Sequence, residues 1–156
     1  MRASVVRLAN TFGPRSNIRT PEFGFVNYFI GLGLQGKELP VYGDGAQMRN
    51  ISYVADVVAA LLAAAASDAS DGQAFFAASD QQFSVRQIAD AIAEQVGGKV
   101  RSVPWPGERA TIEIGDAVIS NAKIARVLGW KPSCDLKSGL ALTRAYFAPN
   151  LGHYLD

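Results

Sequence analysis

Short apolar runs rich in β-branched residues alternate with segments in which apolar residues recur at helical spacing. This alternation restricts the fold more than any other feature of the chain. The run "ASVVRLA" (3–9) is typical of a buried strand. Further on, apolar residues recur at helical spacing from Phe23 to Leu34 and predict a helix over 22–34. Because strands and helices are interleaved in this way, the sequence predicts an α/β fold.

The same alternation continues to the C-terminal end. Ser84 and Gln87 have the spacing of a capping box, and Asp135 can cap the last helix. A helix over 54–66 is expected to bury a stripe made by Val54, Val57, Val58, Leu61 and Leu62. The remaining predictions are a helix over 121–128 and strands over 38–45, 49–54, 73–79 and 99–105, whereas residues 106–119 give none.

The composition is that of an ordinary globular domain. Of 156 residues, 49% are hydrophobic and 19% charged, and the net charge of +1 predicts no general attraction to nucleic acid or membranes. The apolar run 57–66 is far shorter than the roughly 20 residues of a membrane-spanning helix. Cys134 cannot form an internal disulfide, and with His153 it falls short of a zinc ligand set. We therefore expect no metal site and a reducing, cytoplasmic location.

The stretch "GLGLQG" (31–36) fits the G-x-G-x-x-G pattern of dinucleotide-binding loops, with Asp56 at the expected distance beyond it. Such a loop must follow a strand and begin a helix, so that the first N–H groups of the helix face the pyrophosphate. Here the order is reversed, because the glycines end the helix predicted over 22–34. We therefore interpret the stretch as a helix end, and Asp56 as a carboxylate that meets the unpaired N–H groups at the start of its own helix.

Three segments carry a family resemblance when they are read together. They are "RLANTFGPR" (7–15), "LPVYGDGAQMRNISYVADVVAALLAA" (39–64) and "AKIARVLGWKPSCDLKSGLALTRAYF" (122–147). In this order and with these gaps, they resemble the extended short-chain dehydrogenases that act on nucleotide sugars. That family of NAD-dependent epimerases and dehydratases includes UDP-glucose 4-epimerases, sugar 4,6-dehydratases and UDP-glucuronate decarboxylases.

The resemblance implies an α/β fold that is the C-terminal, substrate-binding portion of an extended Rossmann-type enzyme, with residues 1–156 as a single partial domain. Members of the family hold NAD in an N-terminal glycine-rich loop, and a Tyr-x-x-x-Lys pair serves the hydride chemistry at sugar C4. No tyrosine of this chain has a lysine four positions later. We therefore expect no catalytic residue and no NAD bound to this chain alone, and interpret it as a fragment, a truncated gene product or one part of a split protein.

The resemblance also indicates which residues would hold a nucleotide diphosphate sugar. Arg49 and Asn10 correspond to the arginine and asparagine that contact the diphosphate, and Arg109 corresponds to a second arginine near the phosphates or ribose. Pro40 and Tyr42 lie on the strand beside the base, where alternation puts both on one face. The simpler alternatives are a surface ion pair for Arg49, a turn residue for Asn10, and core packing for Pro40 and Tyr42.

Several alternatives stay open in the sequence. Either Glu113 or Asp116 could be the acidic partner of the ribose. The leading interpretation is the nucleotide-sugar-binding part of a UDP-sugar 4-epimerase, inactive alone. The second is a stand-alone binding or interaction module without catalysis, and the weakest is a minimal NAD-binding protein that uses residues 31–36. Because an incomplete parallel sheet exposes strand edges, we also expect the chain to associate with the absent N-terminal half or to form a dimer or larger homo-oligomer.

Overall fold

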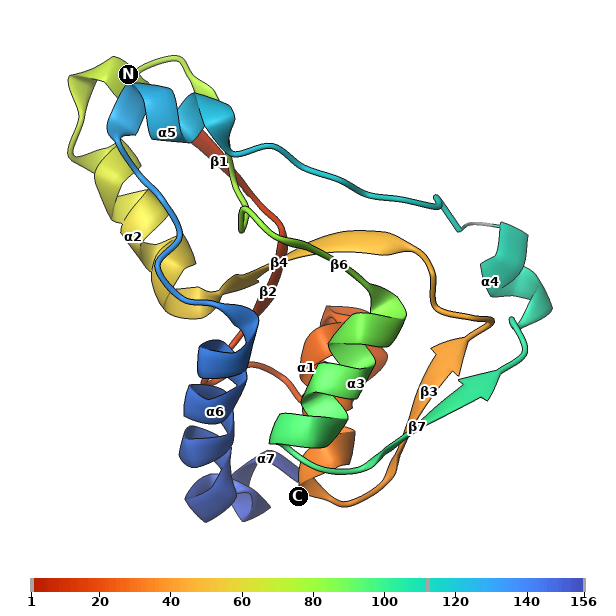
Figure 1. The fold of residues 1–156 in the computed structure, drawn as a ribbon. Coiled ribbons are helices and arrows are strands. Elements are labelled where there is room, and N and C mark those ends of the chain that lie inside the picture. The colour runs from red at the N-terminus through yellow and green to blue at the C-terminus, as the bar shows by residue number, and fades with distance from the viewer. Residues whose placement is uncertain (1, 112, 156) are drawn as a thin grey trace.

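The computed structural model describes residues 2–111 and 113–155, without the side chains of Glu108 and Arg109. Within these residues the strands form three small sheets (Figure 1). Two are parallel pairs: β1 (Val5–Leu8) with β5 (Ala74–Ala77), and β3 (Glu38–Tyr42) with β7 (Lys99–Val103). In the third, β4 (Met48–Tyr53) lies between the parallel β2 (Asn10–Phe12) and the antiparallel β6 (Gln82–Ser84).

Helices follow most of the strands, as the alternating sequence pattern predicts. The α-helices are α1 (Phe25–Leu34), α2 (Val54–Ala65), α3 (Val85–Gln95), α4 (Gly107–Thr111), α5 (Ala122–Leu128), α6 (Leu136–Phe147) and α7 (Gly152–Leu155). Short 3-10 helices cover Pro21–Phe23 (η1), Asp68–Ser70 (η2) and Ala148–Asn150 (η3). The α/β class predicted from the sequence is therefore confirmed.

The helix ends follow the sequence signals. Ser84 and Gln87 form a complete capping box at the start of α3, and the Asp135 carboxylate accepts the Ser138 N–H at the start of α6. Gly129 ends α5 with a φ of 66°, a conformation that glycine adopts without steric cost. The sequence did not predict β2, β6 or α4, because segments of three to five residues are too short to display a period.

The main core lies where α1, α3 and α6 pack on one another and on β3 and β4. Figure 1 shows α1 and α3 between α6 on one side and the β3–β7 ribbon on the other. Side chains from each of these layers are fully buried, among them Ile30, Leu39, Val41, Ile88, Ile92 and Leu140. Phe23, which the sequence placed on the buried side of a helix, lies in η1 instead and is 70% exposed.

A second, smaller core joins β1 and β5 to α2 and α5. The predicted stripe of α2 is confirmed at Val57, which is buried, and is wrong at Val58, Leu61 and Leu62, which are 46–64% exposed. In place of these three, the helix buries Ala60 and Ala64, which are small enough to let the helix approach the strands closely. Val58 and both leucines of α2 are therefore left facing solvent.

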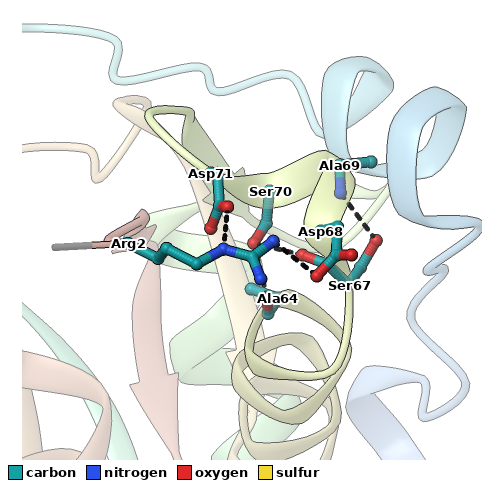
Figure 2. A network of polar contacts seen from close by, with 7 residues as sticks. All are labelled: Arg2, Ala64, Ser67, Asp68, Ala69, Ser70 and Asp71. Carbon is teal, nitrogen blue, oxygen red and sulfur yellow. Dashed lines mark hydrogen bonds and ion pairs between the residues drawn. The ribbon is translucent and has the colours of Figure 1, made fainter.

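The N-terminal end of the chain is attached to the turn that follows α2 (Figure 2). Arg2 makes ion pairs with Asp68 and Asp71, both within or beside η2. Beside them the buried Ser70 hydroxyl lies 2.7 Å from the carbonyl oxygens of both Ala64 and Ser67 and shares its one hydrogen between them. Since the Arg2 side chain is exposed, its ion pairs contribute little to stability, and the buried Ser70 contacts hold the turn.

Candidate functional site

The Arg49 guanidinium makes several hydrogen bonds and is largely shielded from solvent. Arg49 lies on β4 with a side chain only 13% exposed. One guanidinium nitrogen, Nη1, donates to the carbonyl oxygens of Met48 (2.9 Å) and Gly115 (2.5 Å), and Nη2 contacts the Glu113 carboxylate at 2.9 Å. The structure therefore contains the ion pair that the sequence left as the alternative for Arg49, but the guanidinium in it is largely shielded from solvent.

Two of the three residues that accept hydrogen bonds from Arg49 belong to a segment, 113–119, for which the sequence predicted no helix or strand. This segment runs beside β4: the Ala117 N–H donates to Met48 O at 3.0 Å, and the Ile119 N–H donates to Asn50 Oδ1 at 2.7 Å. The Asp116 carboxylate accepts the Met48 N–H at 2.8 Å. Of the two acidic residues left open above, Asp116 thus binds backbone, whereas Glu113 lies at the guanidinium.

Arg49 and Glu113 line a cavity of about 490 Å³ whose other walls are mostly apolar. Its floor is the outer side of β3, where Pro40 and Tyr42 face the cavity while Leu39 and Val41 point into the core. Strand alternation therefore places Pro40 and Tyr42 on one face, as predicted. The opposite wall comes from η1 and α1 through Pro21, Phe25, Tyr28 and Phe29, and the cavity is completed by Gln47, Val85 and Trp105.

Trp105 is one of the cavity residues to which the sequence gave no role. It follows β7, and its indole ring lies 5.2 Å from the Tyr42 ring, centroid to centroid, at an interplanar angle of 34°. The sequence suggested only a strand ending at this tryptophan. The proline on each side of it (104 and 106) was a signal that it does not continue the strand.

Two of the predicted binding residues are not placed in this cavity. Asn10 lies on β2, and its side-chain amide is directed at the Asn50 carbonyl oxygen, at 3.4 Å. It lines a separate hollow with residues of β1 and η1, so the alternative of a turn residue is wrong for Asn10. Arg109 belongs to α4, next to the cavity wall at Trp105, and its side chain lies outside the described part of the chain.

The glycines of the stretch 31–36 serve packing at the end of α1. A Cβ atom on Gly31 would clash with the backbone of Ile18, and one on Gly33 would lie 2.7 Å from the Gly97 carbonyl oxygen. Gly36 turns the chain with a φ of 68°, and β3 follows. The interpretation as a helix end is confirmed, and these residues do not fit a bound dinucleotide, since no helix begins after them.

Asp56 has a different partner from the one the sequence suggested. Its buried carboxylate accepts hydrogen bonds from the Ser133 N–H (3.0 Å), the Ser133 hydroxyl (2.7 Å) and the Cys134 N–H (3.1 Å), and not from the first N–H groups of its own helix. Burial and the carboxylates of Asp56 and Asp135 raise the pKa of the Cys134 thiol. A thiol that stays protonated at neutral pH is a poor nucleophile, so Cys134 is not a candidate catalytic residue.

Among the described residues, no three histidines, cysteines, aspartates or glutamates are grouped in a way that could hold a metal ion. The helices that the structure describes are too short or too polar to span a membrane.

Parallel strand pairs and the helices packed on them define an α/β protein, and solved structures identify its fold as that of the extended short-chain dehydrogenases. The UDP-glucose 4-epimerase of Thermotoga maritima, solved with UDP-glucose, superposes with a TM-score of 0.82 at 30% identity over 97% of this chain. The UDP-glucose 4-epimerase of Thermus thermophilus, solved with NAD, gives 0.77 at 26% identity over 94% of this chain.

The sequence profile of the NAD dependent epimerase/dehydratase family matches residues 1–78, half of the 156 residues, and the chain belongs to this family. Among curated proteins it is 35% identical, over 151 residues, to UDP-glucuronic acid decarboxylase 1 of Xenopus tropicalis, which covers 96% of this chain. The chain spans 34% of that decarboxylase and 47% of each of the two epimerases. The family resemblance stated from the sequence is therefore confirmed.

Proposed function

We propose that this chain is the nucleotide-sugar-binding part of an NAD-dependent epimerase or dehydratase, with a UDP-sugar 4-epimerase as the first choice. The observation that carries the proposal is the pairing of Arg49 with an apolar cavity of about 490 Å³. A guanidinium fork is suited to the oxygens of a diphosphate, and aromatic walls are suited to a nucleobase. Relatives solved with UDP-glucose or with NAD support the substrate class and the cofactor of the complete enzyme.

In this proposal the chain binds and orients the substrate. Arg49 holds the diphosphate, and the base lies beside Pro40 and Tyr42. Roles for Asn10, which lines the separate hollow, and for Arg109 are proposed from the family resemblance alone. The NAD of the complete enzyme would be held by other polypeptide, because residues 31–36 do not fit a dinucleotide. Alone, the chain is therefore expected to bind a nucleotide diphosphate without converting a sugar.

Isothermal titration of the purified chain with UDP, dTDP, GDP and NAD tests the proposal. We expect binding of at least one nucleoside diphosphate and no binding of NAD, and no conversion of UDP-glucose or UDP-galactose when NAD is added. Binding of NAD without any nucleoside diphosphate, or measurable turnover by the chain alone, would contradict the proposal.

The Glu113 carboxylate is expected to compete with phosphate for Arg49. It occupies one edge of the guanidinium at 2.9 Å in the absence of ligand, and a bound diphosphate would bring like charges together there. Glu113→Gln should therefore strengthen UDP binding by up to about fivefold, since a partly exposed ion pair is worth up to about 1 kcal/mol. The control is Glu94→Gln, which removes the same charge from an exposed position on α3 that does not line the cavity. Weaker UDP binding by Glu113→Gln would show that the carboxylate assists the ligand instead.

The surface around α2 is expected to make the purified chain self-associate. Val58, Leu61 and Leu62 are exposed on α2, Val5 and Leu8 are exposed on β1, and in the described residues β1 pairs only with β5. An unpaired strand edge beside exposed apolar side chains favours association with a second copy. Light scattering should give a dimer or larger species, and Leu62→Glu should increase the monomer fraction; a monodisperse wild-type monomer would contradict this expectation.

A further inference from the structure

We propose that Trp105 is the residue on which the nucleobase stacks, so that it sets much of the affinity for the nucleotide. The inference rests on the proposed function and names a contact that the family resemblance did not supply. The rings of Trp105 and Tyr42 lie 5.2 Å apart, centroid to centroid, and both line the cavity that Arg49 also lines. A nucleoside diphosphate needs both elements: a cation for its phosphates and an aromatic face for its base.

The backbone on both sides of Trp105 is restricted, which limits the positions that the indole can take. Trp105 stands between Pro104 and Pro106, and each proline restricts both its own backbone and that of the residue before it. The segment is anchored to the neighbouring turn by the Gly43 N–H, which donates to Val103 O at 2.9 Å. A side chain ordered in advance loses less entropy on binding, so its contact contributes more to affinity.

Gly43 shows that the turn beside β3 is shaped to accept the indole. Its φ is +63°, and a Cβ atom there would lie 2.8 Å from the Trp105 Nε1 atom. Any larger residue at this position would push the indole away from Tyr42. The close approach of Trp105 to this turn therefore depends on the glycine. The ring pair forms because β3, β7 and the turn together bring Tyr42 and Trp105 next to each other.

Stacking on an aromatic ring is tolerant of base identity, because every base has a π-face. Trp105 is thus expected to raise the affinity for uridine, thymidine and guanosine diphosphates by similar factors and to leave the choice among bases to other contacts. It should not affect a ligand that has phosphates but no base. Arg49 has the opposite role, since it would contact any ligand that carries a diphosphate.

Titrations of the 156-residue chain with UDP and with inorganic pyrophosphate separate these roles. Trp105→Ala should bind UDP roughly 5- to 150-fold more weakly, the range expected for one base–aromatic stack. Trp105→Phe, which keeps an aromatic ring, should retain most of the affinity, and neither variant should change the affinity for pyrophosphate. Equal UDP affinity of wild type and Trp105→Ala would overturn this inference alone. Failure of the wild type to bind any nucleotide would overturn the proposed function together with it.

Fluorescence provides a second readout that does not depend on the size of the affinity change. The chain has two tryptophans, and Trp130 is buried in the smaller core with its Nε1 donating to Asp56 O at 3.1 Å. UDP should change the emission of the wild-type chain, and the change should disappear in Trp105→Phe, where only Trp130 remains. An unchanged UDP response in Trp105→Phe would place the base away from Trp105 and contradict the inference.

Discussion

Replacement of Arg49 by alanine is expected to weaken UDP binding by roughly 30-fold or more, because loss of a largely buried, hydrogen-bonded charge costs about 2 kcal/mol or more. The side chain is 13% exposed and faces the cavity, so a phosphate bound beside it would have little contact with water. In Arg49→Ala, water would therefore replace only part of the lost interaction with the phosphate. Isothermal titration of the wild type and the variant with UDP measures the effect.

Two controls make the Arg49 result specific. Arg49→Lys keeps the charge but loses the planar fork, so we expect an affinity between those of wild type and Arg49→Ala. Arg144→Ala removes an exposed arginine from α6, outside the cavity, and should leave UDP binding unchanged. If folded Arg49→Ala bound UDP as the wild type does, the diphosphate would not lie at Arg49.

Replacement of Asp56 by alanine is expected to have the largest effect on stability, lowering the free energy of unfolding by about 3 kcal/mol or more. The buried carboxylate connects α2 to the segment between α5 and α6 through three hydrogen bonds from Ser133 and Cys134. Without it, two backbone N–H groups and one hydroxyl lose their partner. Urea denaturation of the wild type and the variant, followed by circular dichroism, measures the loss.

Asp135→Ala is the matched control for Asp56→Ala. Asp135 also binds backbone N–H groups, but as the exposed cap of α6, where water can replace the carboxylate, so the loss should be clearly smaller. The contact with Ser138 lowers the pKa of Asp135, so its contribution is present above the ordinary aspartate pKa and is lost as the pH falls through the lowered value. If Asp56→Ala and Asp135→Ala lost equal free energy of unfolding, burial of the Asp56 carboxylate would add nothing to stability.

The parts of the fold that the sequence predicted are those fixed by local rules. The capping box at Ser84, the cap at Asp135 and the glycine at the end of α5 depend on neighbours within one helical turn. The buried side of α2 was predicted wrongly because hydrophobicity was taken to indicate burial. In the structure the small Ala60 and Ala64 face the strands, while larger side chains such as Leu62 stay exposed.

The candidate site could be predicted only where it lies on regular structure. Pro40 and Tyr42 alternate along β3, so their shared face followed from the sequence. The pairing of Glu113 with Arg49 and the role of Trp105 were not predicted, because both depend on contacts with residues more than sixty positions away, at Arg49 and Tyr42. Such long-range contacts leave no periodic signal in the sequence.

A crystal structure of the chain soaked with UDP would show whether Arg49 binds a nucleoside diphosphate. We expect electron density for two phosphates beside the Arg49 guanidinium and for a base along Pro40 and Tyr42, against Trp105. Empty density at Arg49, with a dinucleotide bound instead at residues 31–36 in a parallel NAD soak, would contradict this expectation.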